Sequence, residues 1–478
     1  MRKSTTFFSL LLLSAASPAV AQSTPPKQTA VEWIEANQTE VVAVSRDIWE
    51  YAEIGLQEFK SSARLSDLLE RHGFEVQKGV AGIPTAFVAS YGSGKPVIAF
   101  LAEYDALPGL SQDAVPERKA RPDVHAGHAC GHNLYGTAST TAAIAVKQAM
   151  ERHGLPGTVR LYGTPAEETL IGKIYMFRAG AFEDVDAAFS WHTGTSTSAG
   201  FDYTKALASA KFRFEGQAAH ASTSPHTGRS ALDAVELMNV GANYLREHVR
   251  EDARIHYVIT DGGGQPNVVP PEAEVWYYVR ANKYTDLEEY FERLQEIARG
   301  AALMTRTTLE TQVITATHEI LPNRTLAEIV DRNLHAVGAP KFTSEEKAYA
   351  ARLQEALGRS FEVVLSEDIE PLPDEPGQGV ASNDQGDISW FVPIGRMTAA
   401  CYPVGTPGHS WQIVASGGMT IGQKGMLVAA KTLASSGLDV LTDQNALQAA
   451  KQELAERRKN LEYTSLVPED QEAPKQIR

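Results

Sequence analysis

The segment Gly127–Asn133 reads GHACGHN and places Cys130 between His128 and His132. A thiolate and an imidazole two positions apart can chelate one ion, and both are ligands that zinc and related divalent metals accept. The cysteine has two other uses in principle. It could be a nucleophile activated by a histidine, or it could form a disulfide with Cys401, the second of two cysteines.

Further residues of the same chemical types follow apolar segments elsewhere in the chain. They are Asp105 in AEYD, Glu167 and Glu168 in PAEET, His192 in SWHTG and His409 in GTPGHSW. Each one alone is commonly a solvated or hydrogen-bonded polar residue, and we expect only that role for His125 and His128. Their joint occurrence favours a metal site, because a thiol protease would not need two glutamates and two more histidines.

An alternation of apolar strands and helices must position these residues. Strands are predicted at 96–109, 157–169 and 185–194, and helices at 31–51, 61–72, 136–154 and 173–180. Strand and helix in alternation predict an α/β fold with a mostly parallel sheet and flanking helices. Functional groups in such a sheet gather outside the carboxyl ends of the strands, so these residues should converge at one edge.

The pattern changes near Lys205, where alternating strands and two amphipathic helices replace the buried strands. The first pattern returns near 397–437, which indicates that an α+β unit is inserted into the catalytic part of the chain. We therefore predict the following domains: a signal peptide at 1–21, a metal-binding catalytic domain at 22–204 and 319–440, an inserted domain at 205–318, and a polar C-terminal tail at 441–478.

The first residues and the overall charge limit where the protein acts. Basic Arg2 and Lys3, an apolar run and the sequence AVA ending at Ala21 predict a secretory signal peptide cleaved after Ala21. The apolar run is too short to span a membrane. We expect a periplasmic or secreted protein without a membrane anchor after cleavage. The formal charge of −15 argues against nucleic acid or an anionic membrane as partner.

The adjacent glutamates are expected to have different roles. Neighbouring side chains on an extended segment point in different directions, so one can bind metal while the other faces the substrate as general base. A water acidified by the cation would then be the nucleophile.

Six motifs in chain order resemble the two-metal amidohydrolase and aminoacylase family of metallopeptidases, which includes hippurate hydrolase and the plant auxin-conjugate hydrolases. They are HACGHN, PAEET, SWHTG, GQAAHAS, PNVVPPEAEVWYYVR and GTPGHSW. The resemblance extends from about Val31 to Leu438. The Asn after CGH, together with GRSALDAVELMNVG and ILPNRT, is most similar to the branch that contains the B-type p-aminobenzoyl-glutamate hydrolases.

This resemblance implies a lid and dimerisation role for the inserted domain and two divalent ions per chain, zinc, manganese or cobalt. It maps the metal ligands onto Cys130, His132, Glu168, His192 and His409. It makes Glu167 the general base and places His220 in a partner's active site, where it supports the oxyanion. It assigns Asn267 and Arg280 to the substrate carboxylate, and Asp105 to a supporting position behind the ligands. Cys130 stands where peptidase relatives have a bridging aspartate.

The expected function is metal-dependent hydrolysis of N-acyl or N-aroyl amino acids, with p-aminobenzoyl-glutamate-like compounds as the substrate class. A homodimer is expected, and a related second subunit is an open possibility. A dipeptidase or N-acetyl amino-acid deacetylase would use the same site. A non-enzymatic metal-storing or solute-binding protein would need neither Glu167 nor His220, and both are present.

Overall fold

The computed structural model describes residues 24–476. The predicted signal peptide at 1–21 lies outside this range. The helices are α1 (Pro25–Ala36), α2 (Gln38–Tyr51), α3 (Phe59–Arg71), α4 (His132–His153), α5 (Gly172–Arg178), α6 (Ala231–Leu245), α7 (Tyr284–Thr305), α8 (Arg324–Val337), α9 (Ser344–Glu355), α10 (Gly386–Ser389), α11 (Trp411–Gly417), α12 (Thr420–Thr442) and α13 (Gln444–Arg458), with short 3-10 turns at Val80–Gly82, Glu167–Thr169, Pro225–Thr227 and Arg246–His248.

The strands are β1 (Glu75–Lys78), β2 (Phe87–Ser93), β3 (Val97–Ala102), β4 (Leu107–Pro108), β5 (Ala126–Gly127), β6 (Gly157–Gly163), β7 (Ala187–Gly194), β8 (Ser198–Gly200), β9 (Asp202–Tyr203), β10 (Ala206–Glu215), β11 (Arg254–Asp261), β12 (Glu272–Ala281), β13 (Thr308–Thr317), β14 (Gly377–Gln378) and β15 (Ile394–Ala400). Seven of them form one sheet in the order β1-β2-β6-β3-β7-β15-β8. Its centre, β6-β3-β7-β15, is parallel, as predicted.

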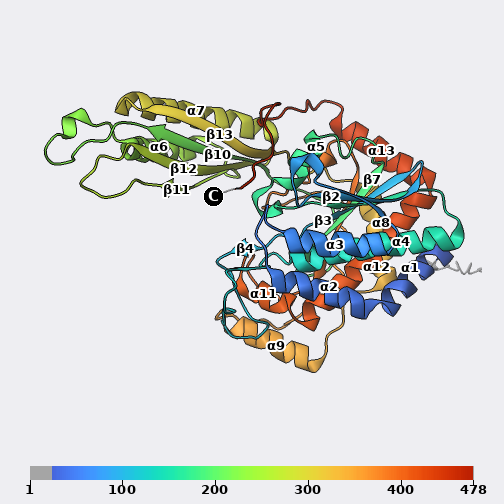
Figure 1. The fold of residues 1–478 in the computed structure, drawn as a ribbon. Coiled ribbons are helices and arrows are strands. Elements are labelled where there is room, and N and C mark those ends of the chain that lie inside the picture. The colour runs from blue at the N-terminus through green and yellow to red at the C-terminus, as the bar shows by residue number, and fades with distance from the viewer. Residues whose placement is uncertain (1–23, 477–478) are drawn as a thin grey trace, which may run out of the picture.

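The central strands are apolar throughout because both faces of the sheet are covered. Ile98 and Phe100 of β3 belong to a core with α4 and α12, which pack on that face beneath α1 and α2. Ala99 and Leu101, which point the other way, belong to a second core with α5. Figure 1 shows these layers in the catalytic part of the molecule.

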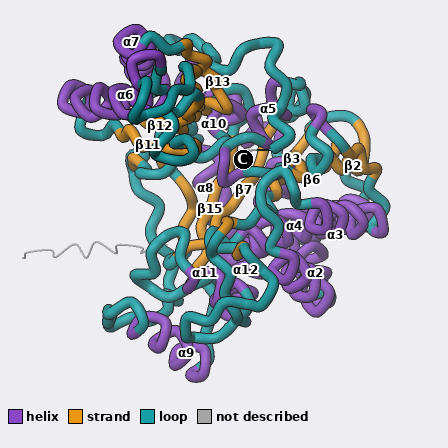
Figure 2. The backbone as a smooth tube through the Cα atoms, turned by 60° about the vertical axis from the view of Figure 1, so that its left-hand side comes forward, coloured by secondary structure: helices purple, strands orange, loops and turns teal. Residues whose placement is uncertain are grey.

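A second sheet has the antiparallel order β11-β12-β10-β13, and α6 and α7 pack on one of its faces. β12 alternates accordingly: Val275, Tyr277 and Val279 are buried, whereas Tyr278 and Arg280 point to the opposite face. The chain enters and leaves this unit on neighbouring strands, with Leu207 paired to Thr317. Figure 2 shows it as a separate lobe beside the catalytic sheet.

Two helical segments differ from the sequence predictions. The single helix predicted at 31–51 is two helices, α1 and α2, broken at Asn37, whose ψ of 11° is not helical. Helix α1 begins earlier, with Pro25 in its first turn, where a proline costs no hydrogen bond.

The stretch 441–478, predicted as a polar tail, contains helix α13. This helix buries Leu447, Ala450 and Leu454. Three apolar residues are too few to make the average composition of this charged segment apolar, so composition alone did not indicate that it packs on the protein. The residues after it run along the junction between the catalytic part and the inserted unit, where the C-terminus lies in Figure 1. We call 463–471 the C-terminal strap.

The strap is fixed by hydrogen bonds to both units. The Tyr463 hydroxyl donates to Asp387 at 2.7 Å, and Gln471 donates to the Tyr175 hydroxyl and to the Val313 carbonyl. Val467 is buried in the second core. Within residues 24–476, none of the helices combines the length and the apolarity needed to cross a membrane.

Candidate functional site

Residues from five segments converge beyond the carboxyl ends of the parallel strands, at the edge that the sequence predicted. Asp105 follows β3, Glu167 and Glu168 follow β6, and His192 lies near the end of β7. His132 is the first residue of α4. Cys130 precedes this helix, and His409 comes from the loop after β15.

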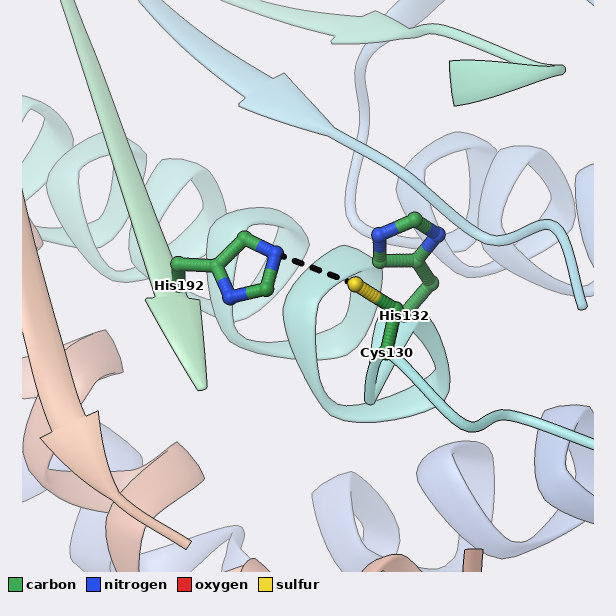
Figure 3. Close-up of side chains that lie close together, drawn as sticks. All are labelled: Cys130, His132 and His192. Carbon is green, nitrogen blue, oxygen red and sulfur yellow. Dashed lines mark hydrogen bonds between the residues drawn. The ribbon is translucent and has the colours of Figure 1, made fainter. Parts of the chain in front are cut away.

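The turn before α4 explains the glycine of the CGH motif. Gly131 has a φ of 79°, and a Cβ there would lie 2.6 Å from the Thr193 side chain. Only glycine fits both the left-handed backbone and the close approach. This turn directs Cys130 Sγ to a position 3.5 Å from His192 Nε2, as Figure 3 shows.

Cys130 is shared between two groups of potential metal ligands. One group is Cys130, His132 and His192, and the other is Cys130, Glu168 and His409. His409 Nε2 lies 3.3 Å from Glu168 Oε2. The two groups together contain the five predicted ligands and no other residue. Cys130 is the residue common to both groups. Both cysteines are free, so the disulfide alternative does not apply.

The adjacent glutamates diverge for a reason different from the one predicted. They lie in a 3-10 turn, not on an extended segment, between Ala166 and Leu170, which are both left-handed. Glu168 has one oxygen near His409, and its other oxygen, Oε1, has no hydrogen-bond partner in the described part of the chain. Glu167 Oε2 lies 3.6 Å from His132 Nε2, and its Oε1 accepts a hydrogen bond from Asn383.

Asp105 orients the site from behind. One carboxylate oxygen accepts from His132 Nδ1 at 2.8 Å, and the second accepts from the Glu168 backbone N–H at 2.9 Å. His132 Nε2 lies on the other side of the ring, 3.2 Å from Glu103 Oε2 and 3.6 Å from Glu167 Oε2. A carboxylate behind a ligating histidine fixes its tautomer and ring orientation. The contact of Asp105 with His132 Nδ1 is the geometry expected for the supporting position behind the ligands.

The electrostatics of the site suit a bound cation. Burial, together with the charge of Asp105, raises the pKa of Glu168 to about 8. Burial and the neighbouring Glu103 and Asp384 hold the pKa of Glu167 well above its usual range. Burial lowers the pKa of His192 and keeps the imidazole neutral, the form that binds metals. Buried carboxylates, a thiol and three imidazoles, together with an unpartnered carboxylate oxygen, form a donor set that fits divalent metals.

Glu103 and Lys173 belong to this site and were missed by the sequence analysis. Glu103 Oε2 lies 3.2 Å from His132 Nε2, and Glu103, His132 and Glu167 form a third potential ligand group. Lys173 Nζ lies 2.8 Å from Glu103 Oε1 and 2.5 Å from Asp384 Oδ1, and all three side chains are fully buried. The sequence feature that could have identified Glu103 is its position directly after a buried strand, two residues before Asp105.

The site opens into a cavity of about 440 Å³, lined by Cys130, both glutamates, His192 and His409 together with residues of the inserted unit. Arg280 and Tyr278 enter from β12, and the Arg280 guanidinium donates to Ser382 at 3.3 Å. Arg280 Nε has no hydrogen-bond partner among the described residues. Arg280, to which the resemblance assigns the substrate carboxylate, thus lines this cavity.

Four predicted or considered residues lie elsewhere. His220 and Asn267 are exposed on the inserted unit and do not line the cavity of their own chain. His128 is buried and bonds to the Ile48 carbonyl at 3.0 Å, and His125 is exposed. Both fit the expectation of polar loop residues near the site.

Comparison with known proteins identifies the family. Residues 203–305 match the M20 peptidase dimerisation domain. The chain is 45% identical to the B-type p-aminobenzoyl-glutamate hydrolase polypeptide of Escherichia coli over 449 residues, which cover 88% of this chain and 93% of the relative. The chain belongs to the M20 metallopeptidase family.

Two further comparisons are consistent with this family. The chain is 30% identical to the Xaa-Arg dipeptidase of Mus musculus over 446 residues, 89% of this chain and 91% of that protein. The crystal structure of a Bacillus subtilis dinuclear metal-binding M20 peptidase aligns with a TM-score of 0.55 at 20% identity, covering 85% of this chain and 99% of that one. As an M20 enzyme the chain is a metal-dependent hydrolase of amide bonds. This excludes the non-enzymatic alternative left open by the sequence.

Proposed function

We propose that this M20 enzyme hydrolyses the amide bond of N-acyl or N-aroyl amino acids, with p-aminobenzoyl-glutamate-like compounds as its substrates and two divalent ions, zinc, manganese or cobalt, per chain. The observation that carries the proposal is the pair of ligand groups joined by Cys130 at the wall of a cavity that also contains Glu167 and Arg280. The 45% identical relative, named for p-aminobenzoyl-glutamate, supports the substrate class.

The ligand assignment follows from the two groups. His132 and His192 would hold one ion, Glu168 and His409 the other, and the Cys130 thiolate both. When bound, the ions supply Lewis acidity, which makes a water acidic and polarises the amide carbonyl. Glu167 borders the same cavity and is not needed as a ligand in either group. It accepts the proton of the attacking water and delivers it to the leaving amine nitrogen.

Arg280 is the proposed anchor for the substrate carboxylate. A guanidinium binds a carboxylate through two parallel N–H groups, and Arg280 enters the cavity with Nε unpartnered among the described residues. The same cavity is also lined by Tyr278 and Met397, which supply apolar surface for an aromatic acyl group. This combination supports an aroyl amino acid over a small acetylated one.

A substrate panel tests the proposal. Hydrolysis of p-aminobenzoyl-glutamate, benzoyl-glycine, an acetylated amino acid and a dipeptide ending in arginine would be measured with and without a chelator. We expect the first to have the highest kcat/KM and all activity to disappear on chelation and return with metal. Equal rates for acetyl and aroyl compounds would contradict the substrate assignment.

Glu167→Gln tests the role of the base. The amide keeps the shape of the side chain but cannot take a proton, so turnover should fall at least about 100-fold while the metal content is unchanged. Glu168→Gln should instead lower the metal content. Reversed phenotypes would exchange the two roles.

A dipeptidase is the second candidate, because the 30% identical relative is named an Xaa-Arg dipeptidase. The panel separates the two candidates directly. A preference for the dipeptide ending in arginine would select this alternative.

We further propose a homodimer in which His220 and Asn267 act in the partner's cavity. The match of 203–305 to a dimerisation domain supports it, as do the exposed apolar Val240 and Tyr244 on α6. His220 would stabilise the oxyanion that forms at the scissile carbonyl. Relatives named as the A and B types of p-aminobenzoyl-glutamate hydrolase both match this chain, so a polypeptide of the A type is a further candidate partner.

Mixing of two inactive variants tests the shared site. Inactive His220→Ala and inactive Glu167→Gln should regain activity on mixing, because a mixed dimer can assemble one intact site. If exchange of chains between dimers is demonstrated and the mixture stays inactive, the shared site is rejected.

We also propose that the protein is exported and released by cleavage after Ala21, on the sequence features of 1–21. Fractionation of cells producing the full chain, with N-terminal sequencing of the product, tests this. An intact N-terminus on cytoplasmic protein would refute it.

A further inference from the structure

The loop 382–387 crosses the site and was not explained by the ligand assignment. Its Asn383 Nδ2 donates a hydrogen bond to Glu167 Oε1 at 2.9 Å. We infer that Asn383 is a positioning residue that holds the Glu167 carboxylate in place for proton transfer, and that the buried Lys173–Asp384 pair fixes Asn383 for this task. The inference rests on the proposed role of Glu167 as general base.

The geometry leaves one oxygen of Glu167 for chemistry. With Oε1 held by Asn383, Oε2 is the oxygen that faces His132, at 3.6 Å from Nε2. A carboxylate with neither oxygen held could rotate about its last bond, and both proton acceptance and proton delivery depend on a fixed distance to the reacting atoms.

The orientation of the Asn383 amide is itself determined. Its Oδ1 accepts the backbone N–H of Gln385 at 2.8 Å, so the Nδ2 group is the one that faces Glu167. Asn383 also lines the cavity, but its two amide atoms are both used within the protein. The side chain therefore acts through Glu167.

Asp384, the next residue, anchors the loop. Its Oδ1 lies 2.5 Å from Lys173 Nζ, and its Oδ2 accepts the Lys173 backbone N–H at 3.1 Å. The Lys173 ammonium also contacts Glu103 Oε1 at 2.8 Å. Buried charges are costly unless paired, and this cation is paired with two fully buried carboxylates. The pair thus links α5, β3 and the loop that carries Asn383.

The backbone after Asn383 is closely packed against the catalytic part. Gly386 is packed so closely on the His318 carbonyl that a Cβ would lie 1.8 Å from its oxygen. Gln385 accepts from the Ser190 hydroxyl at 2.8 Å and donates to the Tyr135 hydroxyl at 3.1 Å, both on elements of the catalytic part. The position of Asn383 is consequently fixed by the packing and hydrogen bonds of the residues that follow it, as well as by the hydrogen bonds of its own amide.

The first test is Asn383→Ala, assayed with the best substrate of the panel. Loss of one hydrogen bond to a charged group should lower kcat on the order of 10- to 100-fold. KM and bound metal should remain within about threefold of the wild-type values, because Asn383 is not a ligand. A kcat within about twofold of wild type would overturn the inference.

Asn383→Asp is the second variant, because it keeps the size of the side chain should the alanine variant fail to fold. A carboxylate cannot donate to Glu167 and repels it, so kcat should fall further than in Asn383→Ala. A folded, metal-loaded Asn383→Asp enzyme with normal kcat would overturn the inference.

A double-mutant cycle separates positioning from general structural damage. Glu167→Asp shortens the side chain and moves its carboxylate out of reach of Asn383. Adding Asn383→Ala to Glu167→Asp should cost less than about threefold in kcat. If the two losses instead multiply, Asn383 acts independently of Glu167 and the inference fails.

Asn333→Ala is the matched control. Asn333 is also a buried amide with hydrogen bonds, to the Ile329 carbonyl and to Asp439, but it lies on α8 outside the site. It should lower the unfolding midpoint and leave kcat unchanged.

Glu167→Gln distinguishes failure of the proposed general base from failure of the positioning role of Asn383. Full activity of Glu167→Gln refutes the assignment of Glu167 as the base. Loss of activity in Glu167→Gln together with normal activity in Asn383→Ala refutes only the positioning role.

Discussion

Removal of one hydroxyl group from the C-terminal strap should destabilise the whole chain. The Tyr463 hydroxyl donates to Asp387 Oδ1 at 2.7 Å, and Asp387 is buried with its other oxygen on the His318 backbone N–H at 3.1 Å. Burial and the nearby Asp387 raise the pKa of Tyr463, so its hydroxyl remains a donor at every ordinary pH. Tyr463→Phe keeps the ring stacked on His318 and removes only this bond.

The expected cost is about 1.5–3 kcal/mol, the range for a hydrogen bond to a charged group whose acceptor stays buried. Little of it is offset by side-chain entropy, because the ring remains packed. Urea unfolding followed by fluorescence measures the change. In an Asp387→Asn background the same substitution should cost about 0.5–1.5 kcal/mol, the range for a neutral pair.

Tyr91→Phe is the control for burial. Tyr91 also donates to a carboxylate, that of Glu151 at 3.1 Å, but this pair is exposed. Its loss should change the free energy of unfolding by no more than about 0.5 kcal/mol. Equal effects of the two substitutions, or a cost below about 0.5 kcal/mol for Tyr463→Phe, would show that the strap does not dock in solution as described.

Three further predictions concern the metal site and the response to pH. Cys130→Ser should lower the metal content measured by elemental analysis, because a hydroxyl does not ionise as a thiol does, and unchanged stoichiometry would remove Cys130 from the ligands. Gly131→Ala should cost about 1–3 kcal/mol in unfolding experiments and also reduce bound metal, since its Cβ would collide with Thr193. Burial raises the pKa of Glu319 from 4.5 to about 7, so the folded protein keeps a proton that the unfolded chain releases. Stability should therefore fall as pH rises from about 4.5 to about 7, by on the order of 3 kcal/mol, and Glu319→Gln should remove this component from unfolding curves measured across that range.

The convergence of the polar residues could be predicted because residues that follow parallel strands meet at one edge of the sheet. The assignment of Cys130, Glu168 and His192 as metal ligands needed the family resemblance as well, because strand order does not separate Glu168 from Glu167. The buried Lys173 could not be found this way. It lies in the first turn of the short helix α5, where a lysine is ordinarily solvated, and its partner Asp384 comes from a loop more than 200 residues later.

The C-terminal region was mispredicted for a related reason. Composition identifies a polar segment, but the burial of α13 depends on a stripe of three apolar residues, Leu447, Ala450 and Leu454. The strap after it has no periodicity, and its order comes from hydrogen bonds to partners such as Asp387 and Tyr175. Such contacts are tertiary and leave no local pattern.

The pairing of Leu207 with Thr317 has a consequence for chain entropy. The chain enters and leaves the inserted unit at points one strand spacing apart, about 4.8 Å. For the catalytic part, the more than one hundred residues in between are therefore equivalent to a loop whose two ends are adjacent, as in a hairpin. Closure of the sheet between β7 and β15 then costs little more than it would without the insertion, because this cost grows only with the logarithm of loop length. The inserted unit can gain or lose residues, or be replaced by a short turn, without changing the register of the strands that position the proposed metal ligands.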